Sequence, residues 1–234
     1  MEIIRIVAPV LEANCYVIVP ELSTKALIVD PGAGASQAVT SVLEQGQWTV
    51  GAVLLTHGHP DHVWDAAAVA HDAPVYIAQA DHYRLEDPVG HTLATRLLFT
   101  GQWNRPTNVQ ILPPALYAAG GAQLIEGCVL QALSTPGHTE GSTVFFGHSQ
   151  VQTHGQDLGF NGHNSQAWML SGDVIFKGSV GRSDLQGSSP QSMEETLRML
   201  KVTVAPETVL LPGHGPATTM SQELITNQFL NSVR

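Results

Sequence analysis

Short apolar runs recur along the chain, separated by turns rich in glycine or proline or by segments with helical spacing. Apolar runs of about four to eight residues are typical of buried strands, whereas apolar residues three or four positions apart indicate helices. Alternation of the two patterns predicts an α/β protein built from layers. The predicted strands are Ile3–Val7, Cys15–Val19, Ala26–Val29, Val50–Leu55, Val75–Ile77, Val129–Leu133, Thr143–Phe146, Ala167–Leu170 and Thr208–Leu211.

Three segments combine helical spacing with a start signal, and we expect helices to begin at Ser36, Ser189 and Ser221. A serine caps the first turn of a helix well, and Pro190 suits the first helical position. The first of these helices is expected to end at Gly46. The side chains expected to face the core are Val39, Val42 and Leu43 in the first helix, Met193, Leu197 and Leu200 in the second, and Ile225, Phe229 and Val233 in the third.

Two stretches, 81–118 and 147–166, fit neither pattern. The first is rich in proline and is expected to form a lid or insertion, and the second is polar and is expected to be a long hairpin connection. Connections of this length in a compact domain are commonly functional. Because 234 residues with 43% apolar side chains suffice for one core, we expect a single domain over residues 1–234.

The charge balance excludes several kinds of partner. The chain has 10 Lys and Arg against 20 Asp and Glu, a formal net charge of −10 at pH 7, and so offers no basic surface for a nucleic acid backbone. No segment approaches the roughly 20 apolar residues that cross a bilayer, and the first apolar stretch lacks a signal cleavage site. We therefore expect a cytoplasmic protein with a small-molecule substrate, no nucleic acid partner and no membrane contact.

Histidine is unusually frequent, with 11 copies, whereas the chain has only 2 cysteines. Cys15 and Cys128 are too far apart for a thiolate zinc motif and lie in apolar runs, so they are expected in the core. Any metal must then be held by His and Asp. Six histidines stand alone and are expected to be ordinary solvated or hydrogen-bonded residues: His71, His82, His91, His148, His154 and His163.

The densest cluster of ligand-type residues follows the strand predicted to end at Leu55. It reads Thr-His-Gly-His-Pro-Asp-His over residues 56–62 and is followed by an alanine-rich helical pattern. In extended backbone, side chains two residues apart point the same way, so His57 and His59 can share one ion. Asp61 and His62 fall at the helix entry and diverge by about a quarter turn. One tetrahedral ion could not easily accept all four, but two neighbouring ions could.

Three more candidate ligands, His138, Asp173 and His214, each follow an apolar run and lie beside a glycine. Strand ends that meet at one edge of a sheet are where α/β proteins build their sites. Imidazole nitrogen and carboxylate oxygen are suitable ligands for a borderline cation such as zinc. Asp30, which precedes Pro31-Gly32, is expected to serve the turn alone.

With these motifs the chain resembles the hydrolases of the metallo-β-lactamase fold, most closely the small thioesterases of the glyoxalase II (hydroxyacylglutathione hydrolase) type. The resemblance covers nearly the whole length, from the N-terminal strands through the Asp-Pro-Gly turn and the 57–62 motif to His214. It implies a four-layer αββα sandwich with a binuclear metal site at one edge. By position in the family motif, the first metal would be held by His57, His59 and His138, the second by Asp61, His62 and His214, and Asp173 would bridge them.

The resemblance also implies hydrolysis of a thioester, or a related small acyl ester, by a hydroxide that bridges the two metals. Two divalent ions about 3.5 to 4 Å apart lower the pKa of a shared water towards about 7. A thiol ionises near pH 8.5, so the leaving group needs no strong general acid. Asp61 and Asp173 are expected to take part in catalysis as well as metal binding. The expected metals are two zinc ions, with iron or manganese as alternatives.

The substrate region of the family is present only in part. Arg182 matches a basic residue that glyoxalase II places near a glutathione carboxylate, but Asp184 stands where a tyrosine is expected. The helical domain that helps to bind glutathione has no counterpart in the 20 residues after His214, which argues against glutathione as the thiol. Three arginines of the 81–118 stretch are expected on the surface, where they could instead form an anion clamp: Arg84, Arg96 and Arg105.

Two other functions fit the same motifs. A persulfide dioxygenase would use one iron held by a histidine of the first cluster together with His138 and Asp173. The Gly213-His214 turn, with its second-site ligand, favours the hydrolase. A non-catalytic binding module would use metal to stabilise its fold, but structural zinc sites are normally closed shells of four ligands.

Overall fold

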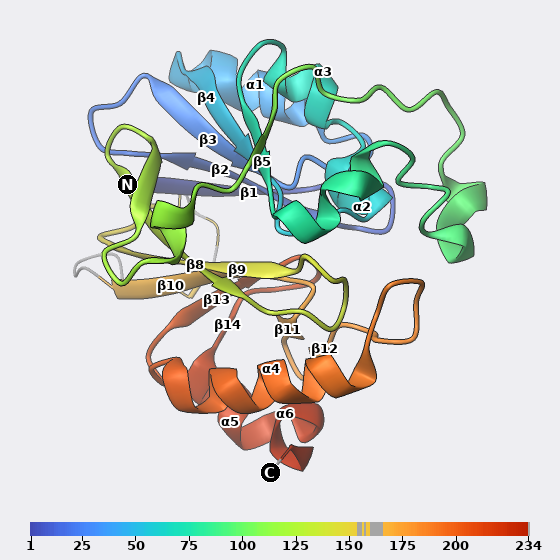
Figure 1. Cartoon of the computed structure of the whole chain (residues 1–234). Helices are drawn as coiled ribbons and strands as arrows, with labels where there is room; N and C mark the ends of the chain where they lie inside the picture. Colours follow the sequence, from blue (N-terminus) through green and yellow to red (C-terminus); the bar gives the residue numbers. More distant parts are fainter. Residues whose placement is uncertain (154–155, 157, 160–165, 234) are drawn as a thin grey trace.

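The computed structural model describes residues 1–153, 156, 158–159 and 166–233, except for the side chains of residues 93–95. Two six-stranded sheets are stacked face to face, and helices cover both outer faces (Figure 1). These four layers confirm the predicted αββα sandwich.

The first sheet is built from the N-terminal half of the chain in the strand order β1-β2-β3-β4-β5-β6. Its first pairs are antiparallel, whereas β3 to β6 run parallel to one another. Helices α1 (Ser36–Gly46) and α3 (Ala66–Ala70) pack on its outer face. The strands are β1 (Glu2–Val7), β2 (Asn14–Val19), β3 (Lys25–Val29), β4 (Thr49–Leu54), β5 (Val75–Ile77) and β6 (Val109–Ile111).

The second sheet has the order β14-β13-β10-β9-β8-β7 and carries the C-terminal helices on its outer face (Figure 1). These helices are α4 (Pro190–Thr203), α5 (Met220–Thr226) and α6 (Gln228–Ser232). A separate hairpin is formed by β11 (Ile175–Phe176) and β12 (Ser179–Val180). The strands of the sheet are β7 (Ala122–Ile125), β8 (Cys128–Ser134), β9 (Thr143–Ser149), β10 (Gln166–Gly172), β13 (Val209–Pro212) and β14 (Thr218–Thr219).

Alternating side chains of each central strand fill two different cores. In β3, Leu27 packs between the sheets and Ile28 packs under the outer helices. In β10, Trp168 lies between the sheets and Met169 faces the C-terminal helices. Strands covered on both faces are apolar at successive positions, which is why the continuous apolar runs predicted them.

All nine predicted strands are present, with bounds that shift by at most a few residues. The helix from Ser36 to Gly46 is also present, but Ser36 is its first residue and its side chain does not cap it. The Asp65 carboxylate accepts hydrogen bonds there from the backbone N–H of Gly34 at 3.1 Å and of Ser36 at 2.8 Å. The cap at Ser189 is confirmed, because its hydroxyl accepts a hydrogen bond from the backbone N–H of Ser192.

The prediction for the last helix is wrong in part. Two short helices replace it because Asn227 ends α5 and caps α6 with its side-chain carbonyl. Val233 is buried as predicted, but Ile225 is 77% exposed and Phe229 is 44% exposed. The residues of these two helices that are buried are Met220, Glu223 and Leu230, so a different face from the predicted one packs on the protein.

The 81–118 stretch is built from short elements: the 3₁₀ helices η1 (Gln79–Leu85), η2 (Leu93–Leu98) and η3 (Pro114–Tyr117), together with strand β6. Because β6 pairs with β5, part of the stretch belongs to the first sheet. Strands β9 and β10 pair antiparallel. Residues 147–149 of the 147–166 stretch belong to β9, and residues 154–155, 157 and 160–165 lie outside the described part of the chain. Among the described residues, no helix is long and apolar enough to span a membrane.

Candidate metal centre

The predicted ligands lie in loops that follow strands. The 57–62 motif follows β4 and continues into helix α2 (Pro60–Val63). His138 follows β8, Asp173 follows β10 and His214 follows β13. Close approach of these loops requires glycine at position 213, because a Cβ there would collide with the Asp173 carboxylate and the His62 ring. Residues far apart in the sequence therefore meet at one edge of the sandwich.

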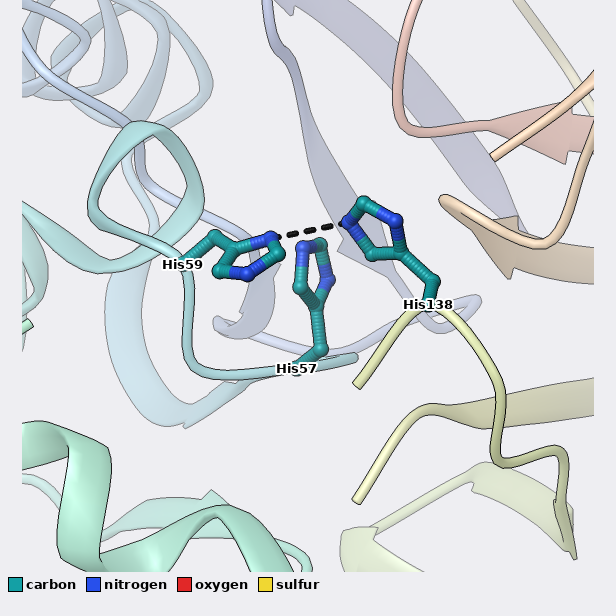
Figure 2. A group of neighbouring side chains, drawn as sticks. All are labelled: His57, His59 and His138. Carbon is teal, nitrogen blue, oxygen red and sulfur yellow. Dashed lines mark hydrogen bonds between the residues drawn. The ribbon is translucent and has the colours of Figure 1, made fainter. Parts of the chain in front are cut away.

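His57, His59 and His138 form the first cluster, and their rings face one another in Figure 2. One nitrogen of each ring lies within 4.8 Å of the others, and His59 Nδ1 is 2.8 Å from His138 Nε2. All three side chains are buried, and His57 Nε2 has no hydrogen-bond partner among the described residues. A buried polar atom without a partner is costly, so the cluster fits a cation with imidazole ligands.

The protonation states of His57 and His59 favour metal binding. Burial, together with the positive charge of His62, lowers the pKa of His57 well below its usual value. Burial and the neighbouring His138 lower the pKa of His59 to about 3. Both imidazoles are therefore neutral near pH 7, the form that binds a metal.

Asp61, His62 and His214 form the second cluster. His214 Nε2 lies 3.3 Å from Asp61 Oδ2 and 3.2 Å from His62 Nε2. Burial opposes a charge on His62, but the charges of Asp173 and Asp61 outweigh burial and raise its pKa well above the usual value. Burial also lowers the pKa of His214, yet hydrogen bonds with Asp173 and Asp61 raise it to about 9. The carboxylates thus make this a site that attracts positive charge.

Asp173 lies between the two clusters. Its Oδ2 is 3.5 Å from His138 Nε2 and 3.5 Å from His214 Nε2, and its Oδ1 is 3.3 Å from His62 Nε2. Oδ1 is buried without a hydrogen-bond partner among the described residues. A carboxylate in this position can contact cations in both clusters, so the His and Asp groups together fit a dinuclear metal centre.

Backbone carbonyls fix two of the histidine rings. His138 Nδ1 donates to the Arg182 carbonyl at 2.8 Å, and His214 Nδ1 donates to the Leu11 carbonyl at 3.0 Å. Because a carbonyl can only accept, each hydrogen bond keeps a proton on Nδ1 and leaves Nε2 to face the centre.

Asp30 has a role at this centre that the sequence pattern does not reveal. Its φ of 48° fits the predicted turn, but its buried carboxylate also accepts hydrogen bonds from Thr56 N at 2.8 Å and Thr56 Oγ1 at 2.7 Å. The same carboxylate lies 3.1 Å from His62 Nδ1. Since the hydroxyl proton of Thr56 goes to Asp30, the hydroxyl oxygen accepts a hydrogen bond from His57 Nδ1, 3.0 Å away. Asp30 thus orients one histidine of each cluster. The sequence feature that could have indicated this role is its position at the end of β3.

The three arginines of the 81–118 stretch were expected to be surface charges, and one of them is not. Arg84 is completely buried, and its guanidinium donates to Glu140 Oε2 at 2.6 Å, so the prediction for this residue is wrong. A buried guanidinium persists when carboxylates and carbonyls satisfy it, and the sequence does not show those distant partners. Arg96 and Arg105 are exposed as expected.

Histidines outside the predicted motifs do not join the two clusters in the described part of the chain. His71, His82, His91 and His148 are among these, and His154 and His163 lie outside the described residues. Both cysteines are buried as predicted, and burial raises the pKa of Cys128 to about 12. Such a thiol is not a nucleophile near pH 7.

A cavity of about 410 Å³ opens above the clusters. Its floor includes His59, Asp61, His138, Asp173 and His214, and its apolar walls are Leu11, Phe176, Val180 and Leu185. Arg182 also lines the cavity, but its side chain is 59% exposed and its Nε lies 2.8 Å from Asp184 Oδ1. The centre is therefore accessible to a small molecule with apolar parts.

Comparison with known proteins identifies the family. The sequence profile of the Metallo-beta-lactamase superfamily matches residues 8–214, and the chain belongs to this superfamily. An uncharacterised protein of Mycobacterium tuberculosis is 34% identical over 97% of this chain and 96% of its own length. The probable metallo-hydrolase YqgX of Bacillus subtilis is 30% identical (94% and 93%), and the hydroxyacylglutathione hydrolase GloC of Haemophilus influenzae is 27% identical (99% and 98%).

Solved structures agree with this family. The B3 metallo-beta-lactamase BLEG-1 superposes with a TM-score of 0.77 at 28% identity, covering 97% of this chain and 99% of its own. TTHA1623, solved in a di-iron-bound form, has a TM-score of 0.72 at 29% identity, with 96% and 98% coverage. ETHE1 of Myxococcus xanthus shares the fold, with a TM-score of 0.68 at 19% identity and 97% and 84% coverage. Family and site together indicate a metal-dependent hydrolase.

Proposed function

We propose that this protein is a thioesterase of the glyoxalase II-like branch, which hydrolyses a thioester or a related small acyl ester at two divalent ions. His57, His59 and His138 would hold the first ion, Asp61, His62 and His214 would hold the second, and Asp173 would contact both. The observation that carries the proposal is the place of Asp173, whose carboxylate lies within 3.5 Å of imidazole nitrogens from both clusters. The name of the H. influenzae relative supports the substrate class.

Two bound divalent ions would supply an activated water near neutral pH and polarise the scissile carbonyl. The protein's contribution is to fix the ligands before substrate arrives. The imidazole rings of both clusters are either buried or hydrogen-bonded to a neighbouring group. Imidazole-rich ligands suit zinc, and the di-iron form of TTHA1623 makes iron the first alternative. Manganese remains compatible with the carboxylates of the second cluster.

The cavity orients the substrate. With its carbonyl directed at the floor, a thioester would lay its apolar part against Leu11, Phe176, Val180 and Leu185. Arg182 at the rim is the residue proposed to contact an anionic group of the substrate, in competition with Asp184. A small molecule is the proposed partner, and neither nucleic acid nor a membrane is proposed.

The proposal predicts turnover of thioesters by metal-quantified protein. We expect about two ions per chain and hydrolysis of at least one member of a panel that includes lactoylglutathione, coenzyme A esters and neutral small thioesters. Removal of metal with a chelator should abolish turnover, and adding the metal back should restore it. Protein that holds both ions and hydrolyses neither a thioester nor a small acyl ester would contradict the proposal, and failure on lactones and phosphodiesters as well would favour a non-catalytic binding module.

Persulfide dioxygenation is the alternative reaction. It would need one iron, for which His214 is not required, whereas His214 lies 3.2 Å from His62 as part of a second cluster. We therefore expect no oxygen uptake when purified protein is given glutathione persulfide. One iron per chain with rapid oxygen uptake would reverse this choice.

A further inference from the structure

A buried carboxylate outside the two clusters touches the loop that carries the first of them. Asp81 lies on η1 and is 0% exposed. Its Oδ2 accepts a hydrogen bond of 2.7 Å from the backbone N–H of Gly58. Gly58 separates His57 from His59, so this hydrogen bond fixes the backbone between two of the three imidazoles.

The same carboxylate also binds the loop that carries the third imidazole. Asp81 Oδ2 accepts a 2.7 Å hydrogen bond from Thr139 Oγ1, and Oδ1 accepts a 2.7 Å hydrogen bond from Gly141 N. Thr139 directly follows His138. One side chain therefore joins two loops that are about 80 residues apart in sequence and that must meet to form the cluster.

Arg84 balances the charge of Asp81 inside the protein. Its Nε lies 3.4 Å from Asp81 Oδ1, and its Nη2 donates to Glu140 Oε2 at 2.6 Å and to the Gln186 carbonyl at 3.1 Å. The loop packs directly on this side chain, because a Cβ at Gly58 would collide with the aliphatic part of Arg84. The buried pair is thus built into the contact between the loops.

We propose that Asp81 is a positioning residue for the first metal cluster. It acts through the backbone of Gly58 and through Thr139 and Gly141, holding His57, His59 and His138 at the spacing that one cation needs. Arg84, whose Nε lies 3.4 Å from Asp81 Oδ1, favours the charged form of the carboxylate. The proposal rests on the ligand set assigned above, and its test measures metal affinity, so it does not depend on which ester the protein hydrolyses.

The test is Asp81→Asn, which keeps the size of the side chain. It replaces one carboxylate oxygen with an amide N–H₂ group, which cannot accept the hydrogen bond that the loops now donate to that oxygen. Titration with Co²⁺ against a chromogenic chelator should show two binding steps in the unmodified protein. In the variant we expect one step to weaken by about 10- to 100-fold, as for other residues that support metal ligands, while the other stays within about threefold. The matched control is the exposed Asp72→Asn, which should change neither step.

Two further variants separate positioning from mere stabilisation of the fold. Thr139→Val removes one of the hydrogen bonds to Asp81, together with the 2.8 Å hydrogen bond between the Thr139 and Ser142 hydroxyls. It should weaken the same step by about fivefold, even if Asp81→Asn folds poorly. Asp81→Asn leaves the charge of Arg84 without that of Asp81, and adding Arg84→Met removes this imbalance. The double variant still lacks the carboxylate that accepts the hydrogen bonds, so the metal-binding step that Asp81→Asn weakens should stay weak. Folded Asp81→Asn with both steps unchanged, or recovery of full affinity in the double variant, would overturn the proposal.

Discussion

Replacement of Asp173 with alanine is expected to lower kcat/KM for thioester hydrolysis by at least about 10³-fold while the protein stays folded. Two bound cations contribute several kcal/mol to the stabilisation of the transition state, and about 4 kcal/mol corresponds to this factor. Among the described residues, Asp173 is the carboxylate that contacts both His138 of the first cluster and His214 of the second, so its removal breaks the link between the two sets of ligands.

The fold should survive this change because the Asp173 side chain lies at the edge of the sandwich and contacts the histidines of the clusters rather than the apolar cores. His62 keeps its contact with Asp30 in the variant. Metal content, measured by mass spectrometry on desalted protein, should fall below two ions per chain.

The exposed Asp72→Ala is a matched control for the loss of a carboxylate, and it should retain both metal and rate. Circular dichroism and urea unfolding establish whether each variant is folded. If Asp173→Ala kept two ions and full turnover, Asp173 would not be the residue that joins the two metals.

The fold could be predicted well wherever a buried segment appears in the sequence as a continuous apolar run. Strands β3 and β10 are apolar on both faces, so their runs are visible without any partner. Strands β6, β7 and β14 are short and lie at or near sheet edges, where exposed side chains interrupt the apolar pattern. The last helix was predicted as one element because its spacing is helical, but the side chain of Asn227 competes for the backbone N–H groups there.

The candidate site was predictable to the extent that its residues share one local feature. Each proposed ligand follows an apolar run and lies beside a glycine or proline, or within the 57–62 motif. Asp81 and Arg84 show no such feature, because their role depends on contacts with residues 140 and 141, about 60 positions away. Buried charges of this kind become recognisable when the loops are placed together, whereas the sequence shows only polar residues in an irregular stretch.

Asp30→Asn is expected to weaken binding of the second ion by about 10- to 100-fold and to lower the free energy of unfolding by about 3 kcal/mol. Asparagine tolerates the left-handed backbone of this position, whose φ is 48°, so the change tests the carboxylate rather than the turn. The amide would present an N–H₂ group either to the N–H or hydroxyl of Thr56 or to His62 Nδ1, all of which now donate to oxygen. The ring of His62 would lose the partner that directs its Nε2 towards Asp61 and Asp173.

Asp65→Asn is the informative control, because this aspartate also holds the loop between β3 and α1 through backbone N–H groups but touches neither cluster. It should lose stability and keep its affinity for both ions. Urea unfolding of metal-free protein and metal titration of folded protein separate the two effects. Equal metal affinities in Asp30→Asn and Asp65→Asn would mean that Asp30 serves the turn alone. If Asp30→Asn binds the second ion more weakly and Asp65→Asn does not, a carboxylate that contacts a metal ligand sets the geometry of the second cluster.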